Sequence, residues 1–118
     1  MKIFIYGSLK KGKKLNYFLN NSIFKYKAKT LKKYPLILSK YEWYPYLLDI
    51  PNKGHFIEGE VYEIDYSTLK RVDRLEEVPF YYKRKKILLK VNNKTIRIYT
   101  YFFVKKKKFL KKELIKNF

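Results

Sequence analysis

Apolar and aromatic residues in this chain fall into short runs that suit strands better than helices. Residues 2–6 (KIFIY) form one such run, which ends at Gly7, and they predict a buried strand. Residues 56–64 (FIEGEVYEI) alternate imperfectly between apolar and polar positions and predict a second strand. Gly59 interrupts that strand, which indicates a bulge or the close approach of another chain segment.

Two longer segments near the end of the chain predict a β-hairpin. Residues 83–91 and 95–104 have strand composition, and residues 92–94 (NNK) between them suit a tight turn. Shorter strands are predicted at 28–31 and 36–38.

Helical patterning is limited to two places. Residues 15–20 (LNYFLN) predict a short helical turn, and residues 66–77 predict the main helix. Asp65 is a suitable N-cap for that helix, and Pro79 ends it. Apolar residues recur at a spacing of three and give the helix one buried stripe, formed by Leu69, Val72 and Leu75.

The remaining pattern is that of one small α+β domain. Short strands dominate and one substantial helix interrupts them, which favours a small, twisted or closed sheet. Residues 41–51 are aromatic and punctuated by prolines, so we expect a loop that packs by its side chains. The 118 residues are enough for one domain with a single core.

The charge balance is strongly basic. Lysine and arginine number 29 against 10 acidic residues, for a net charge of +19. We prefer a bias in residue usage to a polyanion-binding role as the explanation, because the positive charge is spread through every segment except for a concentration at the C-terminus. Salt-sensitive, non-specific binding to polyanions is expected in either case.

Other compositional features exclude several classes. The chain has no cysteine, which excludes disulfides and thiolate metal sites. No apolar run approaches the roughly 20 residues that a membrane helix needs, and the apolar part of the N-terminus is too short for a secretory signal. We therefore expect a soluble, cytoplasmic protein with no membrane partner.

The stretch from Gly7 to Lys13 has nearly the spacing of a phosphate-binding P-loop. That motif requires Ser or Thr after its lysine to hold Mg²⁺, and Lys14 stands there instead. Helices do not alternate with the strands, so the P-loop hypothesis is rejected. The basic run from Lys10 to Lys14 is interpreted as a solvated loop, which could also attract anionic substrates.

Candidate catalytic groups are few. Ser8 would need a base, and the single histidine, His55, offers only a weak case for a catalytic triad or a metal site. Three acids, Asp73, Glu76 and Glu77, lie together at the end of the predicted helix. Carboxylates there oppose the helix dipole, which indicates either a functional site or an ordinary solvated helix end.

Several motifs, in order, resemble the gamma-glutamylcyclotransferase-like superfamily, and within it the gamma-glutamylaminecyclotransferase group. The resemblance covers roughly residues 2–104, which predicts a domain at 1–104 and a basic C-terminal tail at 105–118. The motifs that carry it are IFIYGSLKKG (3–12), YPLIL (34–38), PYLLDIPNKG (45–54), IEGEVYEID (57–65), LKRVDRLEEVPFYYKR (69–84) and IYTYF (98–102).

This resemblance implies a fold and a reaction. The fold would be a small mixed β-barrel flanked by one or two helices. The α-amino group of a γ-glutamyl substrate would attack its own γ-carbonyl, which gives 5-oxoproline and releases an amine. The family uses neither a metal nor an organic cofactor, so none is expected here.

The resemblance also assigns site residues. The family's catalytic glutamate falls on Glu76, as general acid and base, and Glu77 is the near alternative. The family's substrate loop falls on Tyr6, Gly7, Ser8 and Leu9, where backbone N–H groups would bind the γ-glutamyl moiety. The late-strand tyrosine falls on Tyr101, with Tyr99 as the alternative in register.

Three functions stay open at this point. The first is a cyclotransferase for γ-glutamylamines, including the γ-glutamyl-ε-lysine isopeptide. The second acts on another γ-glutamyl amino acid or peptide, and a wall formed by Trp43, Tyr44 and Tyr46 would choose between the two. The third is a non-catalytic basic binding module on the same fold. Neither the leaving amine nor the oligomeric state follows from the sequence.

Overall fold

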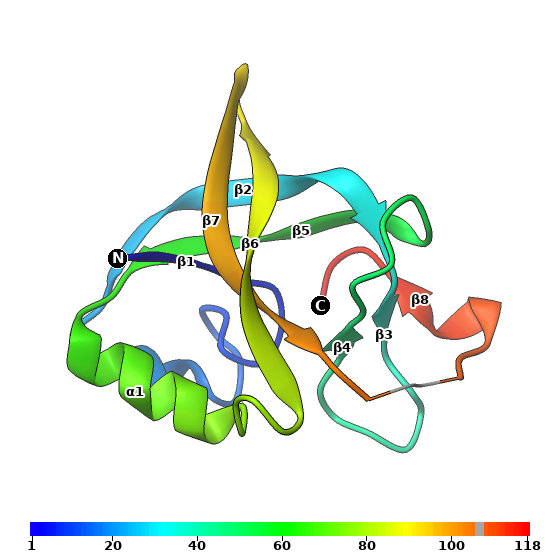
Figure 1. Ribbon diagram of the computed structural model, residues 1–118, viewed down its shortest axis with the longest axis horizontal. Coiled ribbons are helices and arrows are strands. Elements are labelled where there is room, and N and C mark those ends of the chain that lie inside the picture. Colours follow the sequence, from blue (N-terminus) through cyan, green and yellow to red (C-terminus); the bar gives the residue numbers. More distant parts are fainter. Residues whose placement is uncertain (106–107) are drawn as a thin grey trace.

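A closed five-stranded barrel organises the chain (Figure 1), and the computed structural model describes residues 1–105 and 108–118. Around the barrel the strands follow the order β1, β5, β2, β6, β7. Neighbouring strands are antiparallel except β1 and β7, which close the barrel as a parallel pair. The bounds are β1 Lys2–Ile5, β2 Ile23–Tyr34, β5 His55–Glu63, β6 Tyr82–Val91 and β7 Lys94–Phe103. The expected α+β fold on a small mixed barrel is confirmed.

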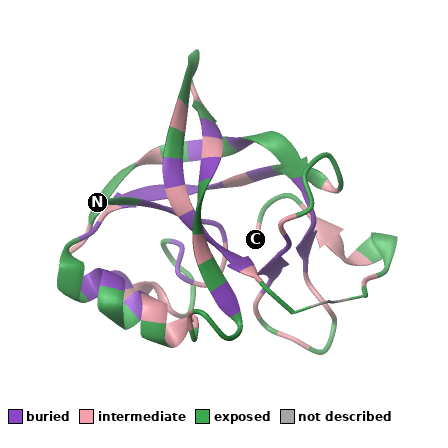
Figure 2. Ribbon diagram, viewed as in Figure 1, coloured by how far each residue is buried: buried purple, intermediate pink, exposed green. Residues whose placement is uncertain are grey.

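The apolar run of β1 is buried on both of its faces. Phe4 points into the barrel core, whereas Ile3 and Ile5 belong to a second cluster on the outside of the barrel. That second cluster includes Leu69 and Val72 of helix α1 (Tyr66–Leu75), which covers this side of the barrel. Burial on two faces explains why this strand reads as a continuous apolar run. Figure 2 shows buried positions interspersed with intermediate and exposed ones along the β6–β7 hairpin.

Gly59 allows β1 to cross β5 closely. A Cβ atom at this position would lie 2.5 Å from the carbonyl oxygen of Ile5 and 2.6 Å from Cζ of Phe4. The expected close approach is therefore confirmed, and its cause is the tight inner packing of a small barrel.

Helix α1 begins where the sequence predicts and ends two residues early. The Asp65 side chain accepts a hydrogen bond from the Thr68 amide at 2.8 Å, which confirms the N-cap. The helix ends at Leu75, so the expected extension to residue 77 is wrong. Glu76 is the C-cap, and Glu77 has a φ of 51°, which turns the chain toward β6.

Short elements complete the fold, with η1 at Asn16–Leu19, β3 at Leu36–Ile37 and β4 at Tyr46–Leu47. The predicted helical turn and hairpin are confirmed, and Asn92 in the hairpin turn has a φ of 55°. The expectation of a loop over residues 41–51 misses β4, which pairs with β3. Among the described residues, no helix is both long and apolar enough to cross a membrane.

The segment expected to be a basic tail contains regular structure. Residues Lys111–Glu113 form η2, and Leu114–Ile115 form β8, which pairs with β3 in a second, three-stranded sheet. In Figure 1 the chain after β8 turns back toward the barrel. Ile115 packs against the barrel core.

Candidate active site

A cavity of about 490 Å³ lies where β1, the loop after it, the end of α1 and strands β6 and β7 meet. The structure brings every predicted site residue to this cavity. Its lining includes Tyr6, Gly7, Ser8, Leu9, Glu76 and Tyr101.

Glu76 carries the most perturbed carboxyl group of the site. Its amide donates to the carbonyl oxygen of Val72 at 2.9 Å, which fixes the residue at the end of α1. The residue is partly buried, and its neighbours along the cavity include Leu75 and Tyr82. Desolvation by this burial disfavours the carboxylate and raises the pKa of Glu76 to about 7. Both protonation states are therefore populated near neutral pH.

Glu77 also lines the cavity but has a different setting. Its side chain is exposed, and its backbone is in the left-handed region. Its carbonyl oxygen accepts hydrogen bonds from the amides of Phe80 at 2.8 Å and Tyr81 at 3.0 Å. The end of the helix thus separates two adjacent glutamates, one desolvated and one in contact with water.

The loop after β1 is folded by local hydrogen bonds. The Lys10 amide donates to the Gly7 carbonyl at 3.0 Å, and the Leu15 amide donates to the Ser8 carbonyl at 2.9 Å. Within the part of the chain that the structure describes, the amides of Ser8 and Leu9 donate no hydrogen bond. Since both residues line the cavity, their N–H groups are available to an anionic ligand.

Gly7 is constrained by a side chain across the cavity wall. A Cβ atom there would lie 3.2 Å from Cγ of Pro45, tighter than most such contacts. The glycine therefore lets the loop pack against the segment that leads into β4.

Tyr101 lies at the centre of a partly buried polar network. Its hydroxyl donates to Oδ1 of Asp73 at 2.5 Å, and Oδ2 of Asp73 lies 3.4 Å from Nη2 of Arg84. The hydroxyl of Tyr6 donates to the carbonyl oxygen of Tyr101 at 2.7 Å. Burial, and then the hydrogen bond with Asp73, raise the pKa of Tyr101 well above its usual range. The network joins β1, β6 and β7 to the end of the helix that carries Glu76.

Tyr99, the alternative in register, does not line the cavity. Tyr99 and Tyr101 are two residues apart and point to the same face of β7. Tyr99 lies nearer the turn of the hairpin, between the side chains of Arg84 and Lys86. The centre of its ring is 5.5 Å from Cζ of Arg84 and 5.3 Å from Nζ of Lys86. The two tyrosines therefore differ in their position along the strand and not in the face to which they point. Tyr101 lies where the end of α1 and the substrate loop meet β7, and Tyr99 does not.

Aromatic rings form the opposite wall. Tyr46 stacks between Tyr44 and Phe103, with ring centres 5.3 Å and 4.7 Å away, and Tyr82 lies 5.3 Å from Phe103. Burial, followed by the charge of Glu76, raises the pKa of Tyr82 well above its usual range. The sequence did not single out Tyr82 or Phe103, because tyrosine and phenylalanine are abundant throughout this chain.

Trp43 extends this wall toward solvent. Its ring lies 4.9 Å from that of Tyr44, and Nζ of Lys14 lies 4.6 Å from the centre of the Trp43 ring. Trp43, Tyr44 and Tyr46 all line the cavity, so the residues expected to form the wall do lie there.

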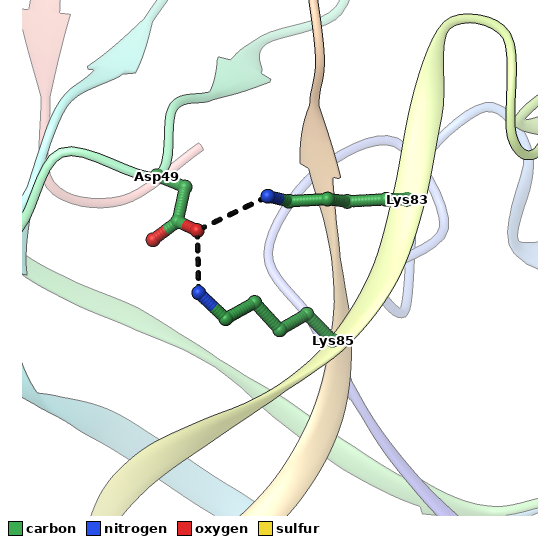
Figure 3. A network of polar contacts seen from close by, with 3 residues as sticks. All are labelled: Asp49, Lys83 and Lys85. Atoms are coloured by element: carbon green, nitrogen blue, oxygen red, sulfur yellow. Dashed lines mark hydrogen bonds and ion pairs between the residues drawn. The ribbon is translucent and has the colours of Figure 1, made fainter.

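The segment after β4 is held to β6 by an ion-pair cluster (Figure 3). Oδ2 of Asp49 lies 2.7 Å from Nζ of Lys85 and 3.4 Å from Nζ of Lys83. The hydrogen bond with Asp49 raises the pKa of Lys85. Because Tyr46 precedes this cluster and Tyr82 precedes Lys83, the contact helps to hold the two aromatic sides of the wall together.

The weaker catalytic alternatives are not assembled. Ser8 lines the cavity, but His55 lies exposed at the first residue of β5 and does not. No group of three or more histidine or acidic side chains among the described residues could hold a metal ion. Among the described residues that line the cavity, Glu76 and Glu77 are the only acidic ones, and that lining contains no lysine or arginine.

Comparisons with known proteins agree with this geometry. Residues 3–117 match the family model described as "Gamma-glutamyl cyclotransferase, AIG2-like". The chain is 34% identical over 96 residues to gamma-glutamylaminecyclotransferase A of Danio rerio, covering 77% of this chain and 60% of that protein. It is 34% identical over 87 residues to the Homo sapiens gamma-glutamylaminecyclotransferase, covering 70% and 57% respectively. The chain thus spans somewhat over half the length of these vertebrate relatives.

A solved structure has the same architecture. The crystal structure of an AIG2-like protein from Mus musculus superposes with a TM-score of 0.78 at 29% sequence identity. The match covers 86% of this chain and 75% of the mouse protein.

Proposed function

The chain belongs to the gamma-glutamyl cyclotransferase, AIG2-like family of enzymes, and we propose that it converts a γ-glutamylamine to 5-oxoproline and a free amine. Glu76 is the general acid and base of this proposal. The observation that carries it is a desolvated carboxyl group with a pKa of about 7, placed in the same cavity as the free amides of the substrate loop.

Glu76 would act twice in one turnover. The α-ammonium group of the substrate is not nucleophilic until the Glu76 carboxylate removes a proton from it. The resulting amine attacks the γ-carbonyl carbon and closes the five-membered ring as a tetrahedral intermediate. Glu76 then returns the proton to the departing nitrogen as the γ C–N bond breaks, and the ring nitrogen, which still carries two protons after the attack, gives up one of them. The products are 5-oxoproline and the amine, which takes up that second proton as its ammonium ion. A pKa near 7 suits both transfers.

The substrate loop would bind the α-carboxylate. The lining includes no cationic side chain among the described residues, so backbone N–H groups must supply the positive partial charge. The amides of Ser8 and Leu9 fit this role. Their fixed position would hold the α-amino group near the γ-carbonyl, and such positioning is a large part of the barrier reduction in ring closure.

The lining also favours an amine leaving group over one with a carboxylate. The aromatic wall of Tyr44, Tyr46 and Phe103 offers apolar surface, and Glu77 adds negative charge near the mouth. A γ-glutamyl amino acid would place a second carboxylate in this cavity without a lysine or arginine in its lining. This observation supports the γ-glutamylamine over the alternative substrates.

The proposal is tested by measuring 5-oxoproline release from a γ-glutamyl panel of simple amines, the ε-lysine isopeptide and dipeptides. We expect simple γ-glutamylamines to be turned over best. In wild type, kcat/KM should fall as the pH drops below about 7, because the base form of Glu76 is lost. The Glu76→Gln variant should lose activity by roughly 10²- to 10⁴-fold, the usual effect of removing a general acid–base group.

The matched control is Glu77→Gln, which changes the adjacent, exposed carboxylate and should retain most activity. Full activity in Glu76→Gln with a loss in Glu77→Gln would transfer the role to Glu77. Absence of release from every member of the panel, by protein shown to be folded, would refute the proposed reaction.

A further inference from the structure

Lys10, interpreted from the sequence as part of a solvated basic loop, is a buried cation. Only 8% of the residue is exposed, although Lys11, Lys13 and Lys14 around it are exposed. Burial lowers the pKa of Lys10, with a smaller effect of Lys13 in the same direction. A buried ammonium group is costly unless its protons are bound by acceptors.

Those acceptors come from the opposite end of the chain. Nζ of Lys10 donates to Oδ1 of Asn117 at 2.6 Å and to the main-chain oxygen of Phe118 at 3.1 Å. Nζ of Lys13 lies 4.8 Å from the centre of the Phe118 ring. The loop that lines the active-site cavity is therefore held from its far side by residues 117–118.

The segment that supplies these acceptors is itself fixed. Ile115 of β8 pairs with Leu36 of β3, and the amide of Glu58 in β5 donates to the carbonyl oxygen of Lys116 at 2.8 Å. Residues 114–116 thus bridge the small sheet and the barrel immediately before the two acceptors. An anchored segment can impose a position on the loop, whereas a loose one could not.

The direction of the side chains couples this contact to the active site. Leu9 is buried and lines the active-site cavity. Lys10, the next residue, lines a second cavity of about 330 Å³ together with Asn117. The hydrogen bonds that hold the Lys10 side chain on this side restrain the backbone of Lys10, and through it the backbone of the adjoining Leu9 on the active-site side.

We propose that Lys10 is a positioning residue and that residues 114–118 act as a strap that holds the substrate loop in its binding conformation. This inference rests on the proposed function for the role of the loop. It gives the basic C-terminal segment a purpose, because its contacts with Lys10 and with β3 support two walls of the active site. Strand β3 pairs in turn with β4, which contains Tyr46 of the aromatic wall.

The test replaces an exposed acceptor, so folding of the core is not at risk. Asn117→Leu removes the Oδ1 acceptor at similar volume, whereas Asn117→Asp keeps an acceptor and adds a charge that pairs with Lys10. Lys116→Leu is the control, since the strap uses only the main chain of that residue. The full-length protein is used throughout.

Two readouts are measured. Amide hydrogen exchange is followed at Lys10 and Lys11, whose amides donate to the Gly7 carbonyl at 3.0 Å and to Oε1 of Glu60 at 2.8 Å. It should accelerate in Asn117→Leu and remain slow in Asn117→Asp and Lys116→Leu. With the γ-glutamylamine that wild type turns over best, KM of Asn117→Leu should rise roughly three- to tenfold, which is the range of one ordinary net hydrogen bond. Its kcat should stay within about twofold, because a bound substrate has already re-ordered the loop and reacts from the same geometry, so the cost of ordering the loop falls on KM. The aspartate variant should restore KM.

The two readouts separate the inference from the proposed function. Unchanged exchange in the loop of Asn117→Leu overturns the strap, whatever the activity. Faster exchange with unchanged KM also overturns it, because the loop would then be held without any effect on substrate binding. If wild type shows no activity on the panel, the proposed function fails, and the exchange comparison still decides whether the strap holds the loop.

Discussion

Replacing Glu76 by glutamine should change the pH dependence of stability in an unusual direction. In the folded protein the pKa of Glu76 is raised from 4.5 to about 7 by desolvation. Well below pH 4.5 the carboxyl group is protonated in both folded and unfolded states, so it does not lower the free energy of unfolding. As the pH rises toward 7, the unfolded chain ionises first and is stabilised relative to the folded protein. Wild type therefore loses stability across this window, opposite to a carboxylate held in a salt bridge.

The size of the effect follows from the shift. Each pKa unit corresponds to about 1.4 kcal/mol, so the full shift is worth about 3 kcal/mol. Because Glu76 is only partly buried and its cavity admits water, about 2 kcal/mol is a more realistic figure. Glutamine has nearly the same shape and never ionises, so the variant avoids this cost at every pH.

The assay is urea unfolding of wild type and Glu76→Gln at fixed salt between pH 4 and pH 8.5. The difference in unfolding free energy should be smallest at pH 4, grow in favour of the variant through pH 4.5–7, and then level off. Glu77→Gln is the control and should show no such growth, since its side chain is exposed. A difference for Glu76→Gln that stays flat with pH would refute the desolvation reasoning. A difference that moved in favour of wild type would mean that the carboxylate has a cationic partner.

Three further outcomes are expected. Tyr101→Phe should cost about 1–2 kcal/mol of unfolding free energy, because a partly buried hydrogen bond to the Asp73 carboxylate is lost. Tyr99→Phe should cost less than half as much. Equal losses of stability in urea unfolding would contradict the role given to the Tyr101–Asp73 hydrogen bond. Gly59→Ala should cost about 3 kcal/mol, because its Cβ would lie 2.5 Å from a β1 carbonyl oxygen. A Cβ atom added at Gly12 has no other atom within 4 Å, so Gly12→Ala should lower the unfolding free energy by only about 1 kcal/mol, because of the φ of 80°. Similar melting temperatures for the Gly59 and Gly12 variants would contradict this account. Finally, the net charge of +19 should give heparin binding that weakens steeply with salt, whereas retention independent of salt would indicate a specific site.

Local features of the fold were predictable because neighbouring residues produce them. The Asp65 cap and the apolar stripe set the start of α1, and the turn at residues 92–94 set the β6–β7 hairpin. The end of α1 was less predictable. Helix propensity alone does not end the helix at Leu75. The left-handed backbone of Glu77 arises because the chain must turn there to enter β6.

Closure of the barrel was beyond pattern analysis. The parallel contact between β1 and β7 joins Ile3 to Tyr99, and β4 consists of two residues within an aromatic segment. Such short or distant pairings leave almost no periodic signal, because their stability comes from burial against the rest of the sheet.

The candidate site also has features that the sequence predicted and features that only the tertiary structure decided. Sequence motifs alone placed the chain in a family and predicted Tyr6, Gly7, Ser8, Leu9, Glu76 and Tyr101 as site residues, since these residue types and their order are local properties of the chain. The tertiary structure decided which glutamate is desolvated, which tyrosine faces the cavity and where the charge of Lys10 is bound. Desolvation and hydrogen bonding depend on what lies within a few ångströms in space. Here those partners are up to 108 residues apart in the chain, as in the contact between Lys10 and Phe118.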